Sequence, residues 1–255
     1  MNQRLPVINL LSYIGLIVVN FLAVKIPYFG RTPGDVSDLY PNLLTPPSFA
    51  FNIWSFIYAL LGIFTIYQAK SIYSKKKVIP TEVSATGLLF LVTCVLNFGW
   101  LLAWQAMYIT WSFVLIFILW ILLILIYYRL AILEKAVWQF TVPFSFYLAW
   151  VCVAALGNLN VMLIDLGFDF FGLTEEYWTA SLIGIGIGGT LLVLYLNEDL
   201  WFTLVLMWAF FGIYVKNREL SEDGNWVITM SLTAIVVLLV AGSWVGWKKW
   251  NRKNQ

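Results

Sequence analysis

Histidine is absent from this 255-residue chain, and cysteine is rare. Histidine is the commonest general base and a preferred metal and haem ligand, so its absence removes the most frequent acid–base and metal sites. The two cysteines, Cys94 and Cys152, both lie inside apolar runs. There, small buried side chains are favoured over a disulfide or a redox pair. The sequence therefore predicts no metal, no cofactor and no catalytic residue.

Charged residues are scarce at 11% of the chain, and none lies in the interior of a long apolar run. Ion-coupled transporters need ionisable groups near the bilayer midplane, where the coupling ion binds. Intramembrane hydrolases need acid–base or nucleophilic groups. We therefore expect neither an ion-coupled carrier nor a hydrolase. The net charge of +2 gives no reason to expect nucleic acid as a partner.

Hydrophobic residues are abundant, at 62% of the chain, and the mean hydropathy is +0.85. This composition is typical of a polytopic membrane protein, so a lipid bilayer is the expected environment. Uncharged runs of about 20 residues can cross a hydrocarbon core about 30 Å thick. They predict an all-α bundle of transmembrane helices, with spans at residues 5–24, 49–68, 83–104, 111–128, 140–163, 178–196, 201–215 and 226–247. The run 201–215 is short enough to be re-entrant instead.

Basic residues follow the alternation of these spans. Most of them fall on one side, in the groups 70–77, 129–135 and 248–253, whereas most acidic residues fall on the other. Cytoplasmic loops carry the excess of Lys and Arg, so both termini are predicted to be cytoplasmic. Helical spans with basic inner loops suit a bacterial cytoplasmic membrane better than an outer membrane, which uses barrels.

The predicted outer loop 25–49 is the longest, and its density of Gly and Pro excludes regular structure. It is either a solvated connector or a lid over the outer mouth of the bundle. By contrast, residues 105–110 predict a tight hairpin between antiparallel neighbours. Gly184 and Gly188 form a GxxxG pair, which is typical of close helix packing, and internal packing is favoured over a dimer face.

Aromatic and amide side chains are the remaining candidates for a site. Trp54 and Tyr58 are one helical turn apart and share a face, where they could anchor the helix at the membrane surface or line a pocket for a flat apolar ligand. Polar residues within the runs are amides and hydroxyls, most of which hydrogen-bond neighbouring helices. A minority line pockets and orient a ligand. The interior amides and hydroxyls are Asn9, Asn20, Thr93, Asn97, Asn158 and Asn160.

Three stretches resemble the tryptophan-rich sensory proteins, also called the translocator or peripheral benzodiazepine receptor family. The stretch PPSFAFNIWSFIYALLG carries Trp54 and Tyr58, LNFGW carries Asn97, and FYLAWVCVAALGN carries Trp150 and Asn158. They occur in the family's order over about the first 165 residues. The resemblance implies a five-helix core, residues 1–165, and a three-helix C-terminal extension, residues 166–255, that short members lack.

The resemblance also implies a receptor or sensor that binds a porphyrin, another tetrapyrrole or a sterol-like ligand in an aromatic pocket under the first outer loop. Trp54 and Trp150 would stack on the ligand, and Ala154 would leave room for it. The implied ligand-binding residues are Phe51, Trp54, Tyr58, Asn97, Trp100, Tyr147, Trp150, Ala154 and Asn158.

Two departures from the family pattern lie next to this predicted pocket. Phe51 stands three residues before Trp54, where the family has four, and Pro143 lies further before Trp150 than usual. The alternatives to a receptor are an uncoupled facilitator of tetrapyrrole or lipid transport, an enzyme that slowly degrades porphyrin, and a structural membrane subunit. The extension could cover the surface that short members use to form a homodimer, so the oligomeric state is open.

Overall fold

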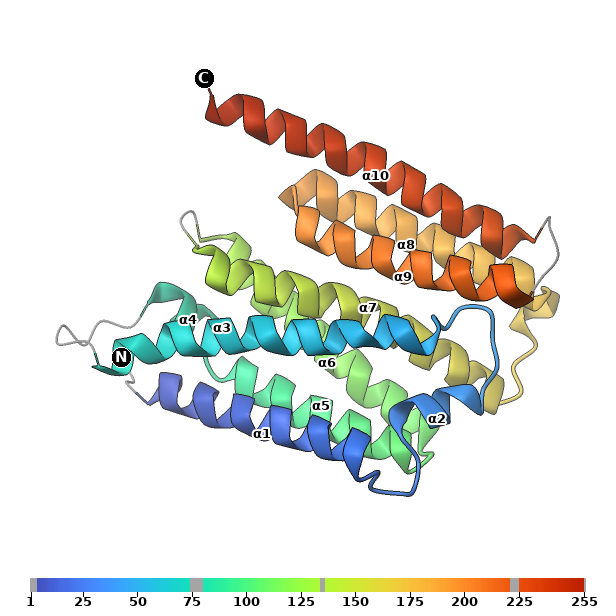
Figure 1. Cartoon of the computed structure of the whole chain (residues 1–255), viewed down its shortest axis with the longest axis horizontal. Helices are drawn as coiled ribbons and strands as arrows, with labels where there is room; N and C mark the ends of the chain where they lie inside the picture. Colours follow the sequence, from blue (N-terminus) through green and yellow to red (C-terminus); the bar gives the residue numbers. More distant parts are fainter. Residues whose placement is uncertain (1–3, 74–79, 134–135, 221–224, 255) are drawn as a thin grey trace. The chain divides into compact units, whose positions relative to one another are not determined.

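The computed structural model describes residues 4–73, 80–133, 136–220 and 225–254, and within these ranges it is helical with no strand (Figure 1). Among the described residues, seven helices are long and apolar enough to cross a membrane. The predicted all-α membrane bundle is therefore confirmed, and the protein is an integral multi-pass membrane protein. These helices are α1 (Leu5–Lys25), α3 (Ile53–Tyr73), α6 (Ile109–Ala131), α7 (Trp138–Asp165), α8 (Glu175–Asn197), α9 (Leu200–Leu220) and α10 (Trp226–Lys253).

The predicted span 83–104 is wrong as a single helix. The chain forms a short helix, α4 (Thr81–Thr86), then bends at Gly87, and continues as α5 (Leu89–Gln105). Gly87 has φ +52°, in the left-handed region that glycine adopts without steric cost, so the helix is interrupted there. At 1.5 Å rise per residue, α5 is about 25 Å long, somewhat short of the hydrocarbon core.

The prediction that the loop 25–49 lacks regular structure is also wrong. It contains the helix α2 (Pro33–Asp38), and the 3-10 helix η1 (Ser48–Asn52) leads directly into α3. A capping box starts α2, because the Thr32 side chain accepts from the backbone N–H of Asp35 while the Asp35 carboxylate accepts from that of Thr32. Pro33 then fits the first helical turn, where its missing N–H costs nothing.

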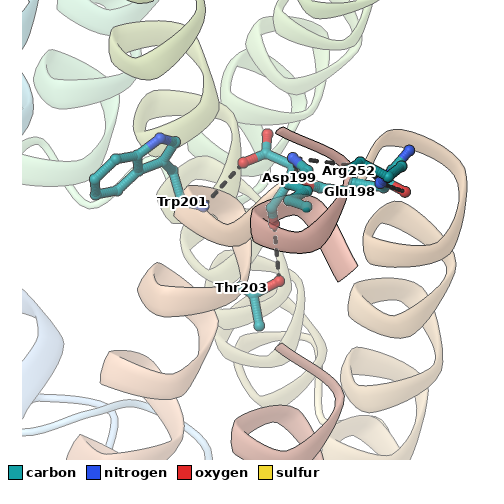
Figure 2. Close-up of polar contacts among 6 residues, drawn as sticks. Glu198, Asp199, Trp201, Thr203 and Arg252 are labelled. Carbon is teal, nitrogen blue, oxygen red and sulfur yellow. Dashed lines mark hydrogen bonds and ion pairs between the residues drawn. The ribbon is translucent and has the colours of Figure 1, made fainter. Parts of the chain in front are cut away.

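The helix α9 spans 21 residues and is longer than the short run 201–215 from which it was predicted. It begins after Asp199, whose carboxylate accepts from the backbone N–H groups of Trp201 at 2.9 Å and Phe202 at 3.1 Å. The Thr203 hydroxyl donates to the Asp199 carbonyl at 2.9 Å, and Figure 2 shows this cap. A carboxylate at this position satisfies N–H groups that have no partner within the helix.

Contacts divide the chain into two compact units. The first unit comprises Met1–Tyr40 and Ile53–Met162, and the second comprises Pro41–Asn52 and Leu163–Gln255. The second unit therefore includes part of the predicted outer loop. That part is separated from the other residues of the unit by more than 100 positions in the sequence. The division into a core at 1–165 and an extension at 166–255 stays a prediction about functional domains.

Interlocked phenylalanine rings form part of the core of the first unit. Phe64 of α3 meets Phe90 of α5 and Phe140 and Phe144 of α7 edge-to-face, with centroids 5.0, 5.3 and 5.1 Å away. All four side chains have zero exposure. Edge-to-face pairs add about 0.5–1.5 kcal/mol each beyond the burial of area. In the same unit, α5 ends at Gln105 and α6 begins at Ile109, which confirms the predicted tight hairpin.

Within the second unit, α8, α9 and α10 pack against one another. A close approach of α8 to α9 lies at Gly186, where an added Cβ would stand 3.1 Å from the ring of Phe210 in α9. Of the predicted GxxxG pair, Gly184 faces Met230 of α10 at 3.6 Å, whereas nothing lies within 4 Å of a Cβ at Gly188. The glycines of α8 therefore serve contacts on two faces, and the pair itself is not the seam.

The turn between α8 and α9 is tied to the C-terminal end of α10. Arg252 donates to both carboxylate oxygens of Glu198 at 2.6 Å, and Lys249 donates to the Glu198 backbone carbonyl at 2.6 Å. Figure 2 shows the Glu198–Arg252 pair. Hydrogen bonding from Arg252, with the nearby lysine charges, lowers the pKa of the Glu198 carboxyl below its ordinary value of 4.5.

We expect Glu198→Gln to lower the melting temperature at pH 7 by about 1–2 °C, because a partly screened ion pair contributes about 0.5 kcal/mol. A depressed folded-state pKa gives stability that is present above the unfolded pKa and lost as the pH falls through the folded one. The difference between wild type and variant should therefore shrink below pH 4.5. Thermal unfolding in detergent between pH 7 and pH 3 measures it, with Glu219→Gln as the control for losing one surface carboxylate. A difference that stays constant with pH would contradict this origin.

Candidate functional site

Four aromatic rings from three helices of the first unit meet around Trp54. Trp54 stacks on Tyr58, one turn further along α3, with centroids 5.6 Å apart and planes at 24°. Trp100 of α5 lies 5.9 Å away, and Tyr147 of α7 approaches edge-on at 6.1 Å. We call these four residues the ring cluster. The sequence spacing predicted the pair on α3, and the fold brings the other two rings to it.

A chain of neutral hydrogen bonds surrounds the ring cluster. The Tyr58 hydroxyl donates to Asn20 Oδ1 at 2.7 Å, and Asn20 Nδ2 donates to Asn97 Oδ1 at 3.0 Å. Asn97 Nδ2 in turn donates to the Tyr147 hydroxyl at 3.4 Å. The chain links α3, α1, α5 and α7 in that order. Because each group is an uncharged amide or phenol, the polar network carries no net charge into the membrane interior.

Asn158 of α7 makes a second polar junction. Its Oδ1 accepts from Trp100 Nε1 at 3.1 Å and from the Ser112 hydroxyl of α6 at 2.7 Å, and its Nδ2 donates to the Ala154 carbonyl at 2.9 Å. Trp100 therefore has its indole N–H fixed while its ring packs against Trp54. The junction sets the orientation of one wall of the ring cluster.

Burial differs across these residues. Tyr147 and Trp150 are 1% exposed and Trp100 is 7% exposed. Trp54 and Tyr58 are only partly buried, so α3 offers the accessible side of the ring cluster. Trp150 lies on α7, one turn from Tyr147, and a ligand could touch its ring only after neighbouring side chains move.

The structure therefore brings together most of the predicted residues but not all of them. Six lie in the ring cluster and its two polar junctions, and Ala154 contributes its backbone carbonyl. Phe51, by contrast, lies in η1 and belongs to the second unit. Asn20, predicted only as an interior amide, also joins the site, and so does Ser112, which was not predicted. An amide in a run as apolar as α1 is the signal that points to Asn20.

The chemistry that this arrangement supports is stacking and weak hydrogen bonding. Phenol and amide groups can orient a ligand, and the ring faces can stack on a flat apolar one. Among the described residues, no three His, Cys, Asp or Glu side chains are grouped so that they could hold a metal ion.

We expect Asn158→Ala to destabilise the first unit by about 1–2 kcal/mol, because it removes the shared acceptor of two donors inside the membrane. Ser112→Ala removes one of these two hydrogen bonds and should cost about half as much. Unfolding in mild detergent with a graded denaturant measures both changes and the double variant. If Ser112→Ala cost as much as Asn158→Ala, the shared-acceptor explanation would be wrong.

Comparison with known proteins adds the family. The chain matches the TSPO-like protein family over residues 6–244, a stretch that includes both units and nearly all of the C-terminal extension. The match agrees with the motifs at Trp54, Asn97 and Trp150, and it extends well past the first 165 residues where they occur. No curated protein and no solved structure matches this chain. The match covers far more than half of the sequence, and the protein therefore belongs to the TSPO-like protein family.

Proposed function

We propose that this protein is a membrane receptor or sensor that binds a porphyrin, or a similar planar apolar ligand, at the ring cluster. The observation that carries the proposal is the convergence of Trp54, Tyr58, Trp100 and Tyr147 from three helices, with the Trp54–Tyr58 stack on the less buried side. A flat ligand that stacked there would extend a series of aromatic contacts already present.

The polar residues support the same ligand class. Asn97, Tyr58 and Tyr147 are neutral and hydrogen-bonded to one another directly or through Asn20. These neutral groups offer no ion-pair partner, so they would hold the apolar ring system of a ligand, and the propionates of a porphyrin would have to lie outside the ring cluster. Membership of the TSPO-like protein family agrees with this reading.

Binding is tested by titrating the full chain in detergent with protoporphyrin IX, following tryptophan fluorescence and the porphyrin absorbance band. We expect saturable binding in the micromolar range. Trp54→Phe should weaken it about three- to tenfold, because a stacking contact contributes about 0.5–1.5 kcal/mol. Trp150→Phe should weaken it less, since that ring is 1% exposed.

The matched control is Trp244→Phe, because Trp244 is 59% exposed on α10 of the second unit. It removes one fluorophore without touching the ring cluster and should leave the affinity unchanged. Equal weakening by all three variants, or no saturable binding by folded wild type, would contradict the proposal. Bleaching of the porphyrin that Trp54→Phe abolishes while binding persists would favour the degrading enzyme instead.

A further inference from the structure

Pro41–Asn52 runs from the predicted outer loop to the start of α3, yet it belongs to the second unit, where side chains of α8 and α9 bond to it. We propose that these two helices clamp the segment and thereby fix the first turn of α3, which makes Lys216, Asn217 and Gly212 positioning residues for the ring cluster. The consequence for ligand binding rests on the proposed function, whereas the mechanical coupling does not. We call these contacts the clamp.

The polar part of the clamp acts on the backbone of residues 42–45. Lys216 Nζ donates to the carbonyls of Asn42 at 2.8 Å and Thr45 at 2.9 Å. Asn217 Nδ2 donates to the Leu43 carbonyl at 3.0 Å. Two adjacent side chains of α9 thus satisfy three backbone carbonyls within residues 42–45. The two hydrogen bonds from Lys216 are charge-assisted and therefore stronger than bonds between neutral groups.

A carboxylate from α8 completes this polar part. Glu175 Oε1 accepts from the Leu43 backbone N–H at 2.7 Å, although the two residues are 132 positions apart. Both backbone polar groups of Leu43 are therefore bonded to side chains of the second unit. Asn42 holds the turn internally, because its Oδ1 accepts from the N–H groups of Leu44 and Thr45 and from the Thr45 hydroxyl. That turn presents the carbonyls to α9.

The apolar part of the clamp depends on a glycine. A Cβ at Gly212 would lie 3.1 Å from Pro46 Cβ, 3.3 Å from Ala50 Cβ and 3.4 Å from Pro47 Cδ. These distances are tighter than ordinary packing, and the neighbours are rigid prolines and a fully buried alanine. Any larger residue at Gly212 would push the segment away from α9.

A tryptophan and two phenylalanines close the apolar part. Trp208 Nε1 donates to the Ala50 carbonyl at 3.1 Å. The Phe49 ring packs edge-on against Trp208 at 5.7 Å and against Phe211 at 6.4 Å. The clamp therefore extends along the segment from Asn42 to Ala50 and reaches η1.

The chain itself transmits the clamp to the ring cluster. The helix η1 ends at Asn52 and α3 begins at Ile53, so no free linker separates the clamped segment from Trp54. Because η1 and α3 are directly joined, a displacement of η1 would also displace the first turn of α3, which carries Trp54 and its stack on Tyr58. Helical turns are stiff, so we infer that loosening the clamp moves Trp54 rather than leaving it in place.

The test uses the full chain in detergent and compares Lys216→Met with Lys216→Arg. Methionine keeps most of the length of the side chain and removes the ammonium, whereas arginine keeps a donor of the same charge. Hydrogen–deuterium exchange is followed by mass spectrometry on peptides that cover residues 41–52 and 53–58. We expect Lys216→Met to speed exchange at least about fivefold in both peptides and Lys216→Arg to restore most of the protection.

The matched control is Lys249→Met. Lys249 also donates its ammonium to a backbone carbonyl of the second unit, that of Glu198, but it does not touch the clamped segment. It should leave both peptides unchanged. If Lys216→Met does not fold, Glu175→Gln weakens the bond to Leu43 more gently and should speed exchange in the same two peptides.

Protoporphyrin IX titration of the same variants separates this proposal from the proposed function. We expect Lys216→Met to weaken binding at least about threefold and Lys249→Met to leave it unchanged. Faster exchange in residues 41–52 without any change in 53–58 would overturn the coupling, whether or not porphyrin binds. Coupled exchange with unchanged porphyrin affinity would overturn the positioning role while leaving the receptor intact. Wild type that binds no porphyrin would refute the proposed function alone, because the exchange result still decides the coupling.

Discussion

The hydrocarbon interior of a bilayer supplies no water, so polar groups of a spanning helix must find hydrogen-bond partners within the protein. Around the ring cluster, the described helices meet this constraint with neutral side chains that bond across the first unit. Asn20, Asn97 and Asn158 each join two or more helices. The positions of the aromatic rings depend on these amides, because Tyr58, Tyr147 and Trp100 all use their polar atoms to reach them.

Neutral junctions also limit the chemistry of the site. An amide or a phenol orients a ligand and can be satisfied by another neutral group when no ligand is bound, as the Tyr58–Asn20–Asn97–Tyr147 series is here. A buried charge without a partner would cost far more. The polar groups of the ring cluster are therefore paired without a ligand, and the proposed binding would require the Trp54–Tyr58 side to exchange some of its contacts for those of a ligand.

The sequence predicted the helices well because uncharged runs of membrane-spanning length leave few alternatives. It also predicted residue pairs within one helix, such as Trp54 with Tyr58, since spacing of three or four residues fixes a shared face. It could not predict which faces of different helices meet. A span that is apolar on all sides has no polar face to indicate its orientation. The hydrogen bond between Asn20 and Asn97 could therefore not be predicted from the sequence. The break at Gly87 could not be predicted for a related reason, because one glycine in an apolar run is compatible with an unbroken helix.

The division of the predicted outer loop, residues 25–49, shows the same limit at longer range. Its first part is held within the first unit, where Gln105 Nε2 donates to the carbonyls of Ala23 and Arg31 and Trp104 Nε1 donates to that of Pro33. Its second part is held by Lys216 and Asn217, more than 170 residues further along the chain. No local pattern marks the change at Pro41. Yet the TSPO-like family match runs to residue 244 and so includes the helices that grip this segment. Residues 41–52 and the helices that bond to them therefore belong to one compact unit, and the family match covers all of them.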